Sequence, residues 1–245
     1  MVDDGMKPEP NPVNLYDHTT IFNLGSSVAN GRYMYHSMDA AIGRDTRKFW
    51  LYGGTGDYER INDVSSPLMD NVLFGIKDDA YPYYRKVPWA KDATKVADLT
   101  DCSNTTDDTT GAECPSSTDT GWFIRLSDYK KVTAEPTIYR GNVYYPIYKP
   151  APGKDRCVLG SAFVCGVDDE CGTNISSQLI GETSGEDVDK QCHFVGRGVL
   201  SELVVYGDDL FANIAGPAET EKTLIKVKAA PGEIDTYRDS WKQNY

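Results

Sequence analysis

Three short stretches carry residue types that occur in catalytic or nucleotide-binding sites. Gly53–Tyr58 resembles a phosphate-binding loop, yet it lacks the Lys-Ser/Thr pair of a Walker loop and the third glycine of a dinucleotide fingerprint. Ser161 is not in a Gly-x-Ser-x-Gly elbow, and no histidine is placed to act as its base. The adjacent Asp168 and Asp169 would point to opposite faces of an extended strand, which suits a turn at a strand end better than joint acid–base work. We therefore expect a protein that is not an enzyme.

The cysteines are the second set of chemically informative residues. Their number is even, and they are Cys102, Cys114, Cys157, Cys165, Cys171 and Cys192. No Cys-x-x-Cys pair exists and the three histidines, His18, His36 and His193, are scattered, so a zinc site is disfavoured. We expect disulfides formed in an oxidising compartment. Neighbourhood in the chain favours Cys102–Cys114 and Cys171–Cys192, which leaves Cys157–Cys165, but sequence alone does not decide the connectivity.

The stretch Asp98–Thr120 is dense in Asp, Thr and Ser. Its carboxylates suggest calcium, but they do not follow the alternating spacing, central glycine and final glutamate of an EF-hand loop. Such a polar stretch cannot bury enough apolar surface to fold alone, so we expect a solvated loop closed by a disulfide. Tyr81–Tyr84 and Thr173–Asp189 are further expected surface loops, and the identity of any metal ligand stays open.

Two triplets match the acceptor motif for N-glycosylation, which matters only in a eukaryotic secretory host. They begin at Asn104 and Asn174. His36 follows Met34 and Tyr35, and we interpret it as an ordinary strand residue. Arg140-Gly141-Asn142 is interpreted as a tight hairpin turn, because Gly and Asn tolerate the positive φ that such turns need.

Composition restricts the class of protein. The 245 residues carry a net charge of −12, a surface that repels phosphate backbones, so we expect no nucleic-acid partner. No apolar run reaches the length of a membrane span. The 22 glycines and 13 prolines punctuate the chain as many short strands require.

The beginning of the chain has no signal-peptide pattern, because Met1–Asn14 is rich in Asp, Pro and Asn and lacks an apolar core. We expect residues 1–20 to be an arm or linker and residues 21–245 to form one folded unit. Oxidised cysteines without an export signal lead us to expect a processed or excised piece of a longer secreted protein, at the cell surface or outside the cell.

An internal repeat decides the expected fold. Ser201–Ile214 aligns without a gap on Ala134–Ile147, and each copy reads as a strand, a turn and a second strand. Ser161–Asp168 and Thr223–Val227 follow as the respective third strands, with Phe163, Cys165 and Val167 alternating across the sheet. A weaker early copy consists of Phe49–Gly56 and Asn71–Asp78, in which we match Phe74 with Val164 and Gly75 with Gly166. Repeated antiparallel units of this size are typical of propeller blades.

The motifs in this order resemble those of the type IV pilus tip-associated PilY family. The segments that carry the resemblance are Phe49–Tyr58, in which Asp57 stands where the family has Arg, and then Asn71–Asp78, Gly121–Leu126, Glu135–Ile138, Asn142–Tyr145, Cys157–Asp168 and Gly198–Trp241. The resemblance implies an all-β fold built of propeller blades, with long disulfide-tied loops. It further implies the C-terminal propeller of an exported protein that supports pilus assembly and adheres to surfaces from the pilus tip.

The resemblance also sets expectations for cofactors and partners. Calcium is possible, but neither Asp98–Asp108 nor Asp168–Glu170 reproduces the family's calcium loop, so no ligand is assigned. The length gives about three to four blades, a partial propeller, whereas a closed ring needs four or more. We therefore expect packing against the remainder of a PilY-like chain, a second polypeptide, or pilins and minor pilins, with a host or abiotic surface as the adhesive target.

Two other classes of function stay open at this level. A glycan-binding propeller lectin is compatible with tyrosine-rich loops, and a glycan array would test it. A quinoprotein-type dehydrogenase also has Trp- and Gly-rich blades, but this chain lacks the adjacent cysteine pair often found there and is too short for an eight-bladed ring.

Overall fold

The computed structural model describes residues 20–78, 81–82, 93–103, 120–151, 158–181, 191–216 and 223–232. The expected arm at residues 1–20 lies almost wholly outside these ranges, as do Cys114 and Cys157. The described chain forms three five-stranded sheets and one short parallel pair, β1 (Phe22–Asn23) with β5 (Thr94–Lys95). None of its helices is long and apolar enough to cross a membrane.

The first sheet, called the first blade below, has the order β2-β3-β4-β7-β6. Its strands are β2 (Asp39–Ile42), β3 (Phe49–Gly54), β4 (Val72–Asp78), β6 (Thr100–Asp101) and β7 (Gly121–Arg125). A short 3-10 turn, η2 (Val96–Asp98), precedes β6. All neighbours are antiparallel except β6 and β7.

The second blade has the order β13-β11-β10-β8, with β9 also pairing with β10. Its strands are β8 (Lys131–Val132), β9 (Thr137–Tyr139), β10 (Asn142–Lys149), β11 (Ser161–Asp168) and β13 (His193–Arg197). The third blade has the order β12-β17-β16-β14, with β15 also pairing with β16. Its strands are β12 (Ile180–Gly181), β14 (Val199–Leu200), β15 (Val204–Tyr206), β16 (Asp209–Ala215) and β17 (Leu224–Lys228), and η3 (Ser176–Gln178) precedes β12.

The predicted repeat is confirmed. The β9–β10 hairpin pairs Tyr139 with Asn142, and the β15–β16 hairpin pairs Tyr206 with Asp209 at the equivalent positions. Arg140 and Gly141 have φ of 52° and 73°, as a two-residue hairpin turn of the primed type requires. One detail of the early copy is wrong: Phe74 packs on the side of the first blade away from the second, whereas Val164 faces the third blade. The match between β4 and β11 therefore shifts by one residue.

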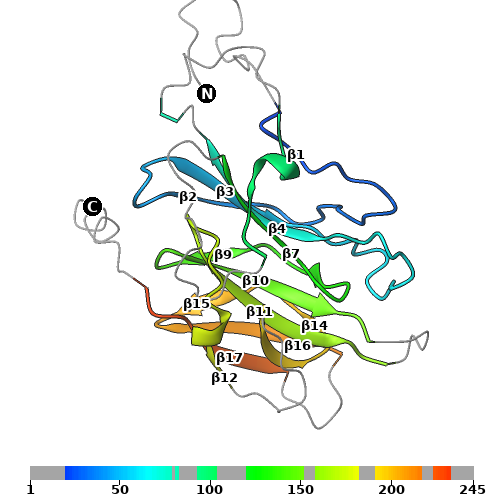
Figure 1. The fold of residues 1–245 in the computed structure, drawn as a ribbon. Helices are drawn as coiled ribbons and strands as arrows, with labels where there is room; N and C mark the ends of the chain where they lie inside the picture. The colour runs from blue at the N-terminus through cyan, green and yellow to red at the C-terminus, as the bar shows by residue number, and fades with distance from the viewer. Residues whose placement is uncertain are drawn as a thin grey trace, which may run out of the picture.

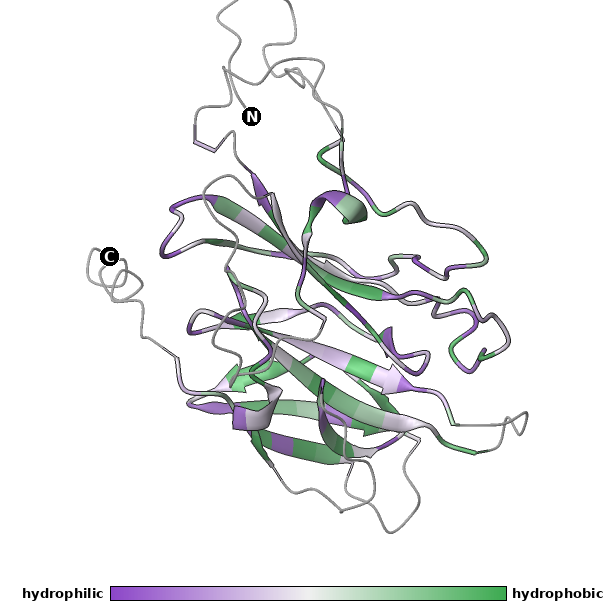
Figure 2. Cartoon of the chain, in the orientation of Figure 1, coloured by the Kyte–Doolittle hydropathy of each residue, from purple (hydrophilic) through white to green (hydrophobic). Residues whose placement is uncertain are grey.

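The blades stack face to face (Figure 1), and hydrophobic residues follow the strands where the sheets meet (Figure 2). The core between the first and second blades includes Trp50, Trp122, Tyr145 and Phe163. The core between the second and third blades includes Tyr144, Val164, Leu210 and Ile225. A third cluster covers the other face of the first blade, where Phe22, Val96 and Leu99 pack on Phe74 and Phe123. β4 and β11 are buried on both faces, which explains their nearly continuous apolar sequences.

Candidate functional site

The paired carboxylates Asp168 and Asp169 lie where the second blade meets the first. The turn after β11 begins with Asp168, whose Oδ1 accepts hydrogen bonds from the backbone N–H groups of Glu170 (3.1 Å) and Cys171 (2.7 Å). This confirms the prediction that Asp168 and Asp169 end a strand. The carboxylate of Asp168 stabilises its own turn.

Glu170 connects this turn to the first blade. Its carboxylate oxygens accept hydrogen bonds from the backbone N–H groups of Asp45 (2.7 Å) and Thr46 (2.8 Å), in the turn between β2 and β3. Hydrogen bonds to an ionised acceptor are among the stronger ones in proteins. The Oγ1 of Thr46 in turn accepts a hydrogen bond of 2.9 Å from the indole of Trp50. The acidic turn of one blade thus holds a turn of its neighbour.

Asp169 links the two blades through its main chain, and its carboxyl group is buried between them. Its N–H donates to the carbonyl of Gly141 (3.0 Å), and its own carbonyl accepts from Nε1 of Trp122 (2.9 Å). The side chain is 8% exposed, and burial, together with the charges of Asp168 and Glu170, raises its pKa to about 7. Nearby, the buried hydroxyl of Tyr52 has no hydrogen-bond partner among the described residues, and burial followed by these carboxylates raises its pKa.

These carboxylates do not fit the calcium that the family resemblance allows. Glu170 and Asp168 already accept main-chain hydrogen bonds. Within the described ranges no group of three or more His, Cys, Asp and Glu side chains is arranged to hold a metal ion. The turn is a structural joint between blades.

The disulfide arrangement corrects the expected pairing. Cys165 of β11 is bonded to Cys192, which precedes β13, with the Cα atoms 4.2 Å apart. The β11–β13 ladder places Val164 opposite His193 and so brings the two neighbouring cysteines together. The expected Cys171–Cys192 and Cys157–Cys165 bridges are therefore wrong. Cys171 is disulfide-bonded as expected.

Cys102 lies against the turn that contains Cys171. Its Sγ lies 3.4 Å from the carbonyl oxygen of Cys171 and donates to it, and Cys114, the expected bridge partner of Cys102, lies outside the described residues. The Cys102 side chain is buried between the blades, and this burial raises the thiol pKa to about 11. A thiol with such a pKa is almost wholly protonated at neutral pH and is a poor nucleophile.

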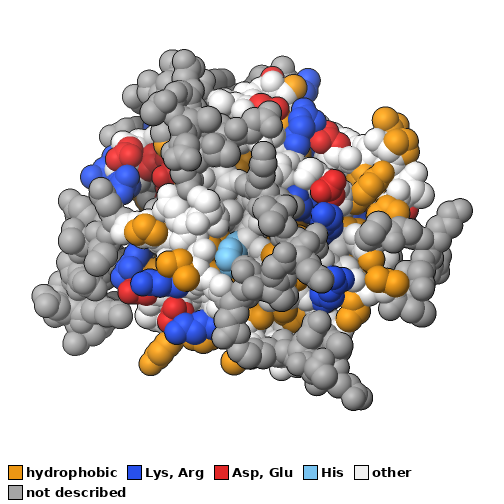
Figure 3. Space-filling view, turned by 60° about the horizontal axis from the view of Figure 1, so that its bottom comes forward, with side chains coloured by type: hydrophobic (Ala, Val, Ile, Leu, Met, Phe, Trp, Pro, Cys, Tyr) orange, Lys and Arg blue, Asp and Glu red, His pale blue; other side chains and the backbone are white. Residues whose placement is uncertain are grey.

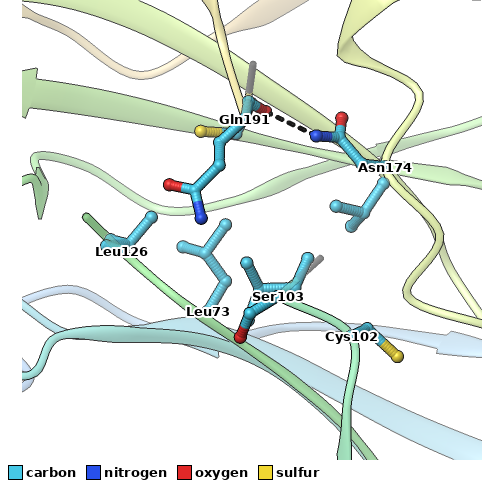
Figure 4. A pocket seen from close by; sticks show the side chains of 9 residues that line it. Leu73, Cys102, Ser103, Leu126, Asn174 and Gln191 are labelled. Atoms are coloured by element: carbon cyan, nitrogen blue, oxygen red, sulfur yellow. Dashed lines mark hydrogen bonds between the residues drawn. The ribbon is translucent and has the colours of Figure 1, made fainter. Parts of the chain in front are cut away.

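Gln191, which no sequence pattern marks, ties the two blades together and directly precedes Cys192 of the disulfide. Its side-chain oxygen accepts from Nζ of Lys130 (3.2 Å), and its amide donates to the carbonyl of Arg125 (2.8 Å). Its main-chain carbonyl accepts from the Asn174 side chain (3.0 Å; Figure 4). Asn174 is thus part of a packed joint, which disfavours glycosylation at its acceptor motif. The small pocket that these residues share with Cys102 and Leu73 has room for about one water molecule.

A buried lysine anchors the turn that follows Gly53–Tyr58, the segment that resembles a phosphate loop. Lys131 is 1% exposed, and its Nζ donates to the main-chain carbonyls of Arg60 (2.6 Å), Ile61 (2.8 Å) and Asp63 (3.2 Å). Burial lowers the lysine pKa to about 8, although the charges of Asp63 and Asp57 oppose the shift. Gly56 allows its segment to lie close to Lys131, because a Cβ at position 56 would lie 2.7 Å from Cβ of Lys131. The expected turn at Gly53–Tyr58 is instead the end of β3 followed by an irregular stretch that packs against Lys131.

The other candidate residues do not converge. Ser161 is buried at the start of β11, and His193 begins β13 with a pKa lowered by burial. His36 packs edge-on against Tyr58, with ring centroids 5.8 Å apart, ahead of β2. The expected loop Asp98–Thr120 is described only at its ends, Asp98–Ser103 and Thr120.

The three stacked five-stranded sheets, mostly antiparallel and each joined to the next through a face-to-face core, define this chain as a β-propeller-like protein. A solved structure that it resembles is the C-terminal domain of Pseudomonas aeruginosa PilY1, with a TM-score of 0.51 and 14% sequence identity. The similarity covers 82% of this chain and 45% of that one, so this chain spans less than half of the similar domain. No protein-family model and no curated protein matches the sequence.

Proposed function

We propose that this chain is a non-catalytic blade segment of a type IV pilus tip-associated protein, which supports pilus assembly and adhesion to surfaces. The observation that carries the proposal is the shared fold with the PilY1 C-terminal domain over 82% of the chain. The order of sequence motifs that resemble the PilY family supports it independently of the coordinates.

Two features of the chain support an exported, binding role. The Cys165–Cys192 disulfide suits an oxidising, extracellular location. The second feature is the use of the buried polar and titratable groups at the joint between blades. They bind main-chain atoms and so hold the frame together, as Glu170, Gln191 and Lys131 do. Propellers of this kind expose loops on a rigid frame, and such loops carry most binding functions. Pilins or minor pilins, the remainder of a PilY-like chain or a second polypeptide, and a host or abiotic surface are the proposed partners.

Gene deletion in the producing organism tests the proposal. We expect fewer surface pili and weaker adhesion in the deletion strain, both restored by the native gene, and immunogold labelling of the protein at fibre tips. A deletion strain with normal pili and adhesion, and with label in the cell body, would contradict the proposal. A second experiment tests for enzyme activity: the purified chain is incubated with pyrroloquinoline quinone and calcium. The absorbance of a bound cofactor together with reduction of a dye would favour the dehydrogenase alternative.

A further inference from the structure

The internal repeat allows the surroundings of one blade to be compared with those of the next. Tyr139 and Tyr144 of the second blade correspond to Tyr206 and Phe211 of the third, because the two hairpins share the same register. The contacts made by the second blade therefore predict what the equivalent residues of the third blade are built to contact.

The second blade docks on the third through one side of its β9–β10 hairpin. The Tyr139 hydroxyl donates to the carbonyl of Gly207, in the turn of the next hairpin (2.8 Å), and the Thr137 hydroxyl donates to the carbonyl of Leu203 (2.9 Å). Tyr144 is fully buried in the core between these blades. This side of the hairpin thus supplies two hydroxyl donors and one aromatic ring to the neighbouring sheet.

The third blade presents the same side without a neighbour in the described chain. Val204 and Tyr206, the equivalents of Thr137 and Tyr139, are 62% and 79% exposed, and Leu224 beside them is 56% exposed. Phe211 lies on this face under Nζ of Lys226, at 6.0 Å from the ring centroid. Figure 3, in which this end of the molecule is turned forward, shows hydrophobic side chains interspersed with Lys and Arg.

The opposite end of the stack is closed. There Phe22, Leu24, Val96 and Leu99 pack over the outer face of the first blade. A second copy of this chain therefore has no matching sheet face to offer at that end. The two ends differ, since one is covered by the chain's own residues and the other keeps the apolar side chains of a docking face.

We infer that the outer face of the third blade, formed by Val204, Tyr206, Phe211 and Leu224, docks a further antiparallel sheet of the same repeat. This inference rests on the proposed function, because a longer propeller would supply that sheet. The Tyr206 hydroxyl donates to a main-chain carbonyl in the hairpin turn of the incoming sheet, as Tyr139 does to Gly207. The interface is continuous with the one between the second and third blades.

The charged residues on this face define the chemistry of the incoming sheet. Lys226 stands opposite Phe211, where the second blade has Gly166 opposite Tyr144, and Lys228 stands opposite Asp209. Lys226 forms an ion pair of 2.8 Å with Asp209, and among the described residues Lys228 has no ion-pair partner, so it adds a positive charge to the face. The incoming sheet therefore carries a carboxylate opposite Lys228, together with apolar side chains over Phe211 and Leu224.

The test supplies the sheet covalently. The full chain is extended at its C-terminus by a flexible linker and a second copy of residues 196–230, whose inner face is the one that packs on the second blade in the native chain. Tyr206→Cys in the original blade is labelled with a maleimide and read by peptide mass, with Val28→Cys, at a site 68% exposed and remote from this face, as the control. We expect labelling at position 206 to slow at least tenfold in the extended chain and labelling at position 28 to stay the same.

A second variant shows that the protection comes from docking. Leu224→Lys in the original blade leaves the melting temperature of the unextended chain unchanged and restores fast labelling at position 206 in the extended chain. Equal labelling rates at position 206 with and without the added copy would overturn the inference, whether the copy folds by itself or stays unfolded, because the docking face is what should order it. The deletion experiment measures tip localisation independently of this labelling. A protein that is found at the pilus tip but is not protected at position 206 would be a pilus protein whose third blade faces solvent.

Discussion

The indole Nε1 of Trp122, in the first blade, donates a 2.9 Å hydrogen bond to the main-chain carbonyl of Asp169, in the second. The ring lies between two glycines that leave space for it. A Cβ on Gly75 would come within 2.6 Å of the ring, and so would a Cβ on Gly172. The contact between the blades thus depends on two positions that carry no side chain.

Replacing Gly75 by Ala should displace the Trp122 ring and lower the free energy of unfolding by about 2–3 kcal/mol, in the range measured for overpacked cores. Gly25→Ala is the matched control, since Gly25 has a φ of 62° but no atom within 4 Å of the added Cβ, and should cost about 1 kcal/mol. Urea unfolding followed by tryptophan fluorescence measures both. Equal losses would show that the ring is not confined as described.

Stability should fall as the pH rises from about 4 to 7, because Asp169 has a pKa raised to about 7 in the folded protein and near 4 in the unfolded chain. Above pH 7 the ionised carboxylate is buried, and Asp169→Asn removes this penalty. We expect the variant to gain about 1–3 kcal/mol over the native chain at pH 8 and little at pH 4. Chemical unfolding at the two pH values measures the gain, with the exposed Asp45→Asn as control. A gain that is the same at both values would exclude ionisation as its cause.

Lys131→Met should release the turn that contains Arg60 and Ile61. The substitution keeps most of the unbranched apolar stem but leaves the main-chain carbonyls of the turn without their ammonium donor, at a cost of about 2–4 kcal/mol. Limited proteolysis with trypsin should then cut after Arg60 at least tenfold faster. Lys228→Met, on the exposed face of β17, is the control and should leave this site protected. Unchanged cleavage would mean that Arg60, through its ion pair with Asp57, holds the turn alone.

Removing the Cys165–Cys192 bridge by Cys165→Ser with Cys192→Ser should lower the free energy of unfolding by about 3 kcal/mol, the amount expected for a closed loop of this length. Thermal unfolding by circular dichroism measures the loss. Cys102→Ser is the contrasting variant, and we expect it to keep the disulfides intact and to change the melting temperature less. A double variant as stable as the native chain would place the stabilising bridge elsewhere.

Much of the blade architecture could be predicted, because it rests on local patterns. The alternation of Trp122, Ile124 and Leu126 against Phe123 reproduces the two cores on either side of β7. The hairpin at Arg140-Gly141 and its equivalent at Gly207 follow from turn residues and from the repeat.

The joints between blades could not be predicted, because they depend on contacts between distant parts of the chain. Glu170 binds the turn at Asp45, and Lys131 binds the turn at Arg60, and no local pattern marks either pair. The cysteine pairing is of the same kind, since the β11–β13 register and not nearness in sequence joins Cys165 to Cys192. For Gln191, the only feature of the sequence that could have indicated its role was its position beside Cys192.

The two-residue strand β12 gives the protein a mechanical property. It lies between β11 and β13 in the sequence, yet Ile180 pairs with Lys228 and Gly181 with Val227 in the third blade. Tension that pulls the third blade from the second therefore acts on this backbone ladder as well as on the core between the sheets. A force that separates the second and third blades is therefore shared between the apolar core and the hydrogen bonds of β12 with β17.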